Sequence, residues 1–163
     1  MRLASNRGAI CLVTDALIIR KARAADVPAL IPLLIEDAIR VLDEAPPDDP
    51  IYADAFAKID ADPNQLLLVG ELDGALVATL QLTFLQYLMH RGRPIGLVEA
   101  VRVSRPLRNR KIGERLMEAA IDEAKRRGCA RVQLTTNKKR FDAHRFYERL
   151  GFEASHQGMK LLL

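Results

Sequence analysis

The stretch that most constrains the fold runs from residue 94 to residue 127 and reads PIGLVEAVRVSRPLRNRKIGERLMEAAIDEAKRR. Its first part is apolar and typical of a strand, and apolar residues recur with helical spacing from about residue 111. Free amides at a helix N-terminus already carry partial positive charge, so cations there are disfavoured unless an anion binds in front of them. Arg108, Arg110 and Lys111 therefore indicate a phosphate site that includes the amides of residues 109 to 113.

Strands and helices alternate along the rest of the chain. Strands are expected at 17–22, 65–85 (a hairpin around Asp73-Gly74), 94–104, 130–136 and, once or twice, within 152–163. Helices are expected at 24–42, 51–62, 111–127 and 141–150. The third helix places Ile112, Leu116, Ala120 and Ala124 on one stripe and ends before Gly128. This order predicts an α/β (α+β) fold, with a mixed, mostly antiparallel central sheet of about six to seven strands flanked by helices.

The chain of 163 residues is 49% hydrophobic and 28% charged, as expected for a soluble protein. It has no apolar run approaching the roughly 18 residues that span a membrane, and its start makes a poor signal peptide, so a cytoplasmic location is expected. Neither the two cysteines nor the three histidines have the spacing of metal ligands, which predicts free thiols and no metal site; they are Cys11, Cys129, His90, His144 and His156.

Charge is distributed unevenly along the chain. Residues 36–62 hold nine acids against Arg40 and Lys58, whereas residues 100–150 hold fifteen lysines and arginines against six acids. This pattern fits one cationic and one anionic partner, and equally two solvated faces. The pI of about 9.3 raises nucleic-acid binding as an alternative. The 5% aromatic content, the lack of tryptophan and the lack of a helix-turn-helix or RNP pattern speak against it.

Two segments resemble the GNAT superfamily of N-acetyltransferases. Residues 108–113, RNRKIG, are similar to its acyl-CoA signature Arg/Gln-x-x-Gly-x-Gly/Ala, although Lys111 replaces the first glycine and brings a Cβ that glycine lacks. Downstream, AHRFYERLGF is similar to the family element A-x-x-h-Y-x-x-x-G-F; the matching residues are Ala143, Phe146, Tyr147, Gly151 and Phe152. The resemblance covers residues 17–163 as a single domain and leaves residues 1–16 as an N-terminal extension.

The resemblance implies an acetyl-CoA-dependent N-acetyltransferase that moves the acetyl group directly to a primary amine in a ternary complex, without a metal. It also allows a homodimer paired through the closing strands. The implied cofactor-binding residues are Val101, Arg102 and Val103 for the pantetheine arm, Arg108, Asn109, Arg110, Lys111, Ile112, Gly113 and Glu114 for the pyrophosphate, and Asn137 for pantetheine again. The resemblance also makes Tyr147 the general acid that protonates the departing thiolate; the other interpretation of Tyr147 is a core aromatic residue.

Acetyl transfer to an amine needs a base, because an alkylamine is protonated at neutral pH. Glu99 sits within the apolar series Ile95, Leu97, Val101 and Val103, which would share one face of a strand. Burial of a carboxyl raises its pKa towards neutrality, which suits a base. The alternative is a carboxylate buried in a structural pair with an arginine.

The acidic segment 36–62 falls where this family builds its acceptor site, so a cationic amine or a basic peptide is a candidate acceptor. The replacement of glycine by Lys111 leaves a second possibility, a catalytically silent acyl-CoA-binding regulatory protein. Of the two, the sequence favours the enzyme, because Tyr147 and Glu99 are both present.

Overall fold

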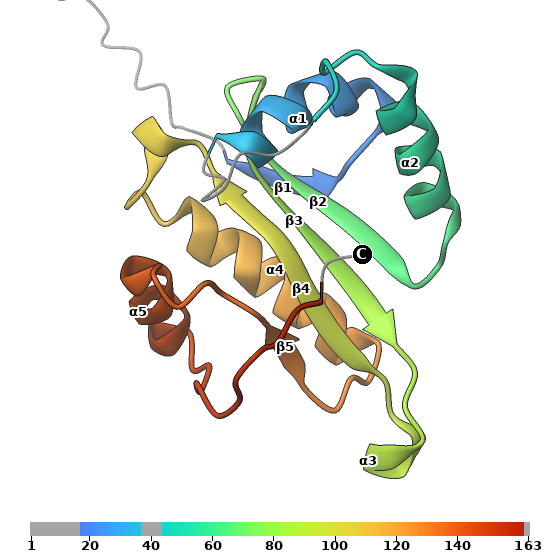
Figure 1. The fold of residues 1–163 in the computed structure, drawn as a ribbon, viewed down its shortest axis with the longest axis vertical. Helices are drawn as coiled ribbons and strands as arrows, with labels where there is room; N and C mark the ends of the chain where they lie inside the picture. Colours follow the sequence, from blue (N-terminus) through green and yellow to red (C-terminus); the bar gives the residue numbers. More distant parts are fainter. Residues whose placement is uncertain (1–16, 37–43, 162–163) are drawn as a thin grey trace, which may run out of the picture.

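The computed structural model describes residues 17–36 and 44–161, which fold around a five-stranded sheet in the order β1-β2-β3-β4-β5 (Figure 1). The strands are β1 (Ile18–Lys21), β2 (Gln65–Leu72), β3 (Ala75–Leu85), β4 (Ile95–Val103) and β5 (Val132–Leu134). Neighbouring strands are antiparallel from β1 to β4, and β5 runs parallel to β4. The predicted mixed, mostly antiparallel sheet is confirmed, with five strands in place of six to seven.

The hairpin of β2 and β3 follows from its turn residues. Asp73 and Gly74 both have positive φ, at 51° and 80°. A two-residue turn with positive φ at both positions matches the twist of the strands on either side. The predicted hairpin is therefore confirmed, and it forms the centre of the sheet.

Helices cover both faces of the sheet. They are η1 (Ala24–Asp26), α1 (Val27–Ile35), α2 (Pro50–Ala61), α3 (Met89–Gly92), η2 (Arg105–Leu107), α4 (Ile112–Arg126) and α5 (Phe141–Arg149). On one face, Leu30 of α1 and Phe56 of α2 form a buried cluster with Val69 of β2. On the other face, α4 packs its apolar stripe into a larger cluster that includes Leu80 and Val98.

The expected helix 24–42 is α1, which starts after a 3-10 turn and has a proline in its first turn, where a missing N–H costs nothing. Residues 37–43 of that expectation, and the expected extension 1–16, lie outside the described residues. Within the described ranges, no helix has the length and apolar character needed to cross a membrane.

Helix α4 connects β4 to β5 as predicted. Its expected apolar stripe is buried, and Leu116 and Ala120 are fully inaccessible to solvent. The helix ends where Gly128 adopts a φ of 70°, with the Gly128 N–H donating to Lys125 O and the Cys129 N–H donating to Ala124 O, both at 2.9 Å. This is a glycine-terminated helix end that satisfies the last carbonyls.

The closing strands expected within 152–163 are wrong for the part that is described. Residues 153–161 form no strand and are exposed along their whole length. The stretch EASHQG has no alternating apolar face to bury, so pairing with the sheet would gain little. This difference accounts for the lower number of strands, and it also places His156 outside a strand.

The single-face pattern expected for β4 is wrong because the strand contains a bulge. Gln81 of β3 pairs with Glu99 of β4. Thr79 lies two residues from Gln81 on β3, but it pairs with Arg102, which lies three residues from Glu99 on β4. Ala100 takes up the extra residue with a φ of 52°. Side-chain alternation therefore shifts by one, and Val101 packs with Val98 against the cluster under α4.

Candidate active site

Strands β4 and β5 pair over only three residues and then part. The parallel ladder ends at the pair Val98 and Leu134, whereas β4 continues to Val103. Within the described ranges no strand pairs with this side of β4 beyond Val98, and we call residues 99–103 the open edge of β4. Its carbonyls are held by arginines: Arg102 Nη1 donates to Val101 O at 2.9 Å, and Arg108 Nε donates to Val103 O at 3.2 Å.

The loop from β4 to α4 contains two non-glycine residues in the left-handed region, Asn109 with a φ of 63° and Lys111 with a φ of 61°. Lys111 is the N-cap of α4. A Cβ is crowded in this region, which explains why glycine is preferred at the position that Lys111 occupies. Lys111 therefore adopts, at a conformational cost, a backbone conformation that glycine adopts readily.

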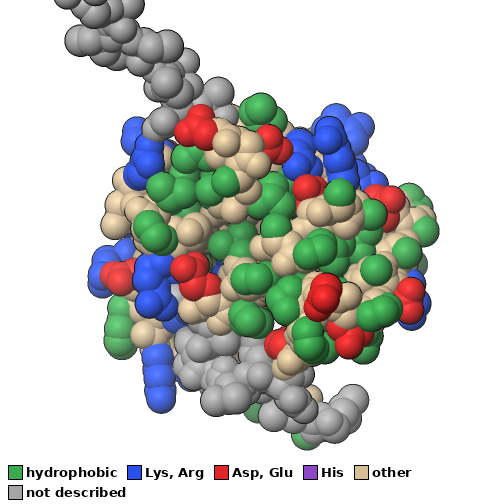
Figure 2. All heavy atoms as spheres, turned by 90° about the horizontal axis from the view of Figure 1, so that it is seen from above, with side chains coloured by type: hydrophobic (Ala, Val, Ile, Leu, Met, Phe, Trp, Pro, Cys, Tyr) green, Lys and Arg blue, Asp and Glu red, His purple; other side chains and the backbone are tan. Residues whose placement is uncertain are grey.

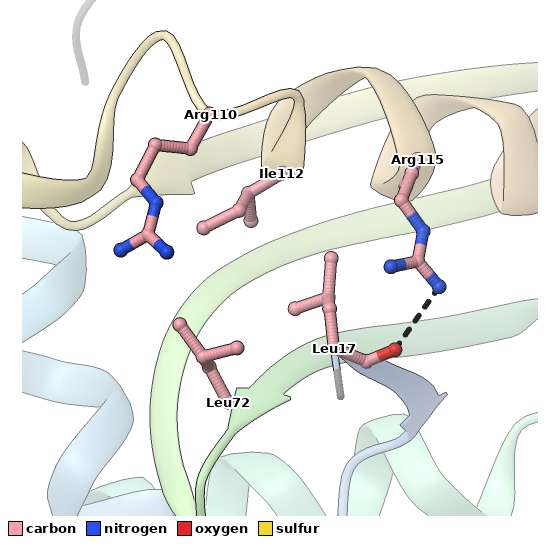
Figure 3. Close-up of a pocket in the computed structure, with 5 residues that line it drawn as sticks. All are labelled: Leu17, Leu72, Arg110, Ile112 and Arg115. Carbon is pink, nitrogen blue, oxygen red and sulfur yellow. Dashed lines mark hydrogen bonds between the residues drawn. The ribbon is translucent and has the colours of Figure 1, made fainter. Parts of the chain in front are cut away.

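The three cations of this loop do not gather at one point. Arg108 turns back to the end of β4, and the Lys111 side chain is exposed. Arg110 reaches toward the ends of β1 and β2, where it lines a pocket of about 160 Å³ (Figure 3). The other lining residues are Leu17, Leu72, Ile112 and Arg115, and Arg115 donates to Leu17 O at 3.0 Å. The structure therefore separates the side chain of Arg110 from that of Arg108.

Gly113 joins the start of α4 to α5. A Cβ built on Gly113 would meet Phe146 Cζ and Val103 Cγ2, each at 3.4 Å. The absence of a side chain therefore lets the first turn of α4, the end of β4 and α5 approach one another closely. This contact brings the predicted pyrophosphate loop next to the helix that carries Tyr147, and Ile112 is buried beside it.

Tyr147 is held by two neighbouring rings. Its ring packs edge-to-face on Phe146 at 5.1 Å and on Phe152 at 5.9 Å, measured between ring centroids. Its hydroxyl makes no hydrogen bond to another described residue. Burial raises the pKa of the Tyr147 phenol above its ordinary value of 10, while the positive charges of Arg140 and Arg102 act in the opposite direction. A phenol in this state stays protonated and can donate its proton.

Glu99 does not have the buried position that the sequence predicts. Its side chain is exposed, although it lies before the bulge and keeps the face of Leu97. Polar residues lie near it on β3 and β2. Gln81 of β3 lies directly opposite Glu99. Gln65 Oε1 of β2 accepts hydrogen bonds from Gln81 Nε2 at 3.0 Å and from Thr83 Oγ1 at 2.9 Å. Glu99 therefore belongs to a polar surface that spans β2, β3 and β4.

Asn137 has a role within its own loop. Its Oδ1 accepts the Lys139 N–H at 2.9 Å, and its carbonyl lies 3.1 Å from His144 Nε2. Asn137 thus closes a turn before α5, and its contact with pantetheine stays a prediction. Glu114 is half-buried in the first turn of α4.

The acids of the segment 36–62 mostly have partners within the described part of the chain. Asp49 caps α2, Asp62 accepts the Asn64 N–H at 2.8 Å, and Asp60 pairs with Lys21 at 2.7 Å. Glu36 accepts the Arg105 N–H at 3.2 Å, and Glu44 accepts the Tyr52 hydroxyl at 2.7 Å. Figure 2 shows acidic side chains scattered among apolar and basic ones on the face that it presents, in place of one acidic patch.

Two features of the site were missed at the level of sequence. The first is the side chain of Arg102, because the sequence predicts binding only through the backbone of this strand. In the structure this side chain reaches α1, where Nε donates to Leu34 O at 3.0 Å. Arg140, the residue before α5, contributes positive charge at Tyr147. The cluster of lysines and arginines at 138–140 was visible, but the sequence holds no signal that separates Arg140 from its neighbours. Among the described residues, no group of three His, Cys, Asp or Glu side chains is placed to hold a metal ion.

Comparison with known proteins identifies the family of the chain. Residues 28–152 match the family model for the acetyltransferase (GNAT) family. The chain is 37% identical over 105 residues to an aminoalkylphosphonate N-acetyltransferase of Salmonella typhimurium, covering 64% of this chain and 68% of that protein.

Solved structures share the fold. A transcriptional regulator from Bacillus halodurans C-125 is 38% identical with a TM-score of 0.83, covering 91% of this chain and 100% of that chain. A glucosamine-6-phosphate N-acetyltransferase from Arabidopsis thaliana has a TM-score of 0.78 at 22% identity, covering 91% and 99% of the two chains, which shows the fold alone. The chain therefore belongs to the GNAT family and is an acetyl-CoA-dependent N-acetyltransferase.

Proposed function

We propose that this enzyme transfers the acetyl group directly from acetyl-CoA to a primary amine, with Tyr147 as general acid and Glu99 as base. The observation that carries the proposal is the position of Tyr147. It lies on the helix that packs, through Phe146, against Gly113 in the first turn of α4. A thioester held with its pyrophosphate at the start of α4 and its arm along the open edge of β4 would lead towards this phenol.

The proposed reaction exchanges a C–S bond for a C–N bond and moves three protons. Glu99 takes a proton from the ammonium group of the acceptor, directly or through a water molecule, and the free amine attacks the thioester carbonyl. The C–N bond forms, the C–S bond breaks, and the sulfur leaves with the bonding electron pair. Tyr147 gives its proton to this thiolate, and the phenolate is reprotonated by the second proton that the nitrogen loses. The products are the acetamide, free CoA thiol and one proton released to solvent through Glu99.

The cofactor arm of the proposal uses the residues around the open edge. Backbone groups of Val101 and Val103 would bind the pantetheine arm, and the amides of residues 108–114 would bind the pyrophosphate. Arg108 and Lys111 belong to the same loop as those amides, and charge-assisted hydrogen bonds to phosphate are the strong kind. The contact at Gly113 supports the fit, because a larger side chain would fill the space between α4 and α5.

A covalent acetyl-enzyme on Cys129 is not supported. This thiol lies after the C-terminal end of α4, at the opposite end of the helix from Lys111. Burial raises the pKa of the Cys129 thiol, so that less of it is the nucleophilic thiolate at neutral pH. Direct transfer needs no such intermediate.

The preference for a cationic acceptor, expected from the acidic segment, loses much of its support once that segment is seen folded. Asp49, Asp60 and Asp62 serve as caps or ion-pair partners. The charge of Asp60 is compensated by Lys21, and Asp49 and Asp62 accept backbone N–H groups of their own segment. The proposed acceptor is therefore a primary amine, without a requirement for a second cationic group.

The first test is calorimetric titration with acetyl-CoA, with desulfo-CoA and adenosine bisphosphate as controls. We expect micromolar binding that requires the pyrophosphate, since adenosine bisphosphate lacks it. Thiol release on addition of amines then tests transfer, and Tyr147→Phe should release thiol slowly while binding acetyl-CoA normally. A failure to bind acetyl-CoA would overturn the proposal.

A further inference from the structure

We propose that Glu99 and Arg102 together select a zwitterionic acceptor, in which a short spacer joins the primary amine to an acidic group such as a phosphonate or a carboxylate. This inference rests on the proposed function, because it concerns the acceptor of the same transfer. Glu99 receives the amine, and Arg102 receives the acidic group.

The bulge in β4 creates this pair. In a regular strand, residues 99 and 102 would lie on opposite faces, because side chains alternate. Since Glu99 pairs with Gln81 and Arg102 pairs with Thr79, the extra residue at Ala100 returns Arg102 to the face of Glu99. Gln81 and Thr79 are two residues apart on β3, which sets the separation of the Glu99 and Arg102 Cα atoms at about 7 Å. A carboxylate and a guanidinium therefore stand side by side on one face.

The guanidinium of Arg102 is positioned by the helix that covers this face. Nε donates to Leu34 O of α1 at 3.0 Å, and Nη1 donates to Val101 O at 2.9 Å. The side chain is half-buried, so that less water competes for it. A guanidinium held in this way keeps its positive charge at a fixed place, where it can attract an oxyanion such as a phosphonate or carboxylate.

The surroundings of the pair favour small polar acceptors. Gln65, Gln81 and Thr83 form a hydrogen-bonded polar surface next to Glu99, where an apolar substituent would gain nothing. The charge of Arg102 reaches the Tyr147 phenol, and Arg140 adds to it. A second cationic group on the acceptor would therefore be repelled close to the reacting end, whereas an acidic group would be attracted.

The test compares four amines that share a two-carbon spacer and differ only in the second group: 2-aminoethylphosphonate, β-alanine, ethanolamine and 1,2-diaminoethane. Thiol release from acetyl-CoA gives kcat and KM for each. We expect kcat/KM to fall in that order, with about 10- to 100-fold between the phosphonate and ethanolamine, the range for a hydrogen-bonded charge.

Substitution of Arg102 separates recognition from catalysis. Arg102→Gln should raise KM for the phosphonate about 10-fold more than it raises KM for ethanolamine, and Arg102→Lys should retain part of the preference. Because Arg102 Nη1 also donates to Val101 O, the affinity for acetyl-CoA is measured by calorimetry in the same variants, and the comparison between the two amines separates acceptor selection from a change in cofactor binding. Arg131→Gln, which removes an exposed cation near His90 and Gln133, is the matched control and should leave the order of acceptors intact.

The outcomes are distinguishable. Equal rates with all four amines, or a preference for the diamine, would overturn the selection by Glu99 and Arg102 and leave the proposed transfer standing. An unchanged acceptor order in Arg102→Gln would do the same. Absence of thiol release with every amine, in a protein that binds acetyl-CoA, would overturn both proposals.

Discussion

Gly113 in the first turn of α4 lies against Phe146 of α5, so closely that a Cβ on Gly113 would stand 3.4 Å from Phe146 Cζ. Through this contact the start of α4 determines where α5 lies, and with it Tyr147. A distance of 3.4 Å is the lower limit of an ordinary carbon contact, so one methyl group fits and a branched side chain does not.

Substitution at Gly113 should therefore show a sharp size limit. Gly113→Ala should keep activity and raise the free energy of unfolding by up to about 1 kcal/mol, because alanine favours helix. Gly113→Val should lower the free energy of unfolding by about 1–3 kcal/mol through overpacking. It should also lower kcat, because the larger side chain displaces α5. Urea unfolding and thiol-release kinetics measure both effects. Wild-type kcat in Gly113→Val would show that α5 does not depend on this contact.

Tyr147→Phe should lower kcat about 100-fold, within the range for a general acid, and leave KM for acetyl-CoA nearly unchanged. Because the pKa of Tyr147 is raised above 10, the wild-type enzyme should not lose rate through this group below pH 10. Tyr87→Phe is the matched control, since Tyr87 packs beside His90 after the end of β3, where β3 pairs with the start of β4 and not with its open edge. Equal losses in the two variants would remove Tyr147 as the acid.

Glu99→Gln should lower kcat/KM about 10- to 100-fold at neutral pH. The amide cannot accept a proton, yet it keeps the size of the carboxylate. Glu118→Gln removes an exposed acid on α4 and controls for the change of net charge. An unchanged kcat/KM in Glu99→Gln would assign proton removal to water alone.

The features of the fold that could be predicted from the sequence are those that neighbouring residues determine. The turn at Asp73-Gly74 needs two residues that tolerate positive φ, and the buried stripe of α4 needs only helical spacing, so both were predictable from neighbouring residues. The signature at 108–113 and the element around Tyr147 are also local patterns, and they indicate the family and the start of the site.

The features that sequence could not supply depend on distant contacts. The bulge at Ala100 inserts one residue into β4 without a glycine or any other marker, and only pairing with β3 reveals it. The shared face of Glu99 and Arg102 follows from that bulge. The roles of the acids in 36–62 are equally non-local: Asp60 pairs with Lys21 of β1, which lies far away in the sequence.

Asp26 should contribute pH-dependent stability. Arg20 binds both of its carboxylate oxygens, at 2.7 and 3.0 Å, and this contact, with the Arg23 N–H, holds the pKa of Asp26 below its usual value of 3.8. A lowered pKa means that the stabilisation is complete above about pH 4 and is lost as pH falls through the folded-state pKa. Asp26→Asn should therefore cost about 1–3 kcal/mol at pH 7 and progressively less below pH 4.

The control for Asp26 is Asp60→Asn. Asp60 pairs with Lys21 at 2.7 Å, but both side chains are about half exposed, so its loss should cost less than about 1 kcal/mol. Urea unfolding across the acid range measures both variants. A cost for Asp26→Asn that does not change with pH would mean that packing, and not charge, gives Asp26 its effect.

Lys111→Gly tests the departure from the acyl-CoA signature, and two effects should oppose each other. Glycine removes the strain of a left-handed lysine, which should raise the free energy of unfolding by about 1 kcal/mol. The loss of the ammonium group should weaken acetyl-CoA binding about two- to fivefold at low salt, and the difference should shrink at high salt because exposed charges are screened. Asn109→Gly is the control: asparagine tolerates this conformation, so the gain in stability should be smaller, and no charge is lost. Acetyl-CoA binding as tight as in the wild type, together with the gain in stability, would show that Lys111 is dispensable for holding the pyrophosphate and that the amides of α4 suffice.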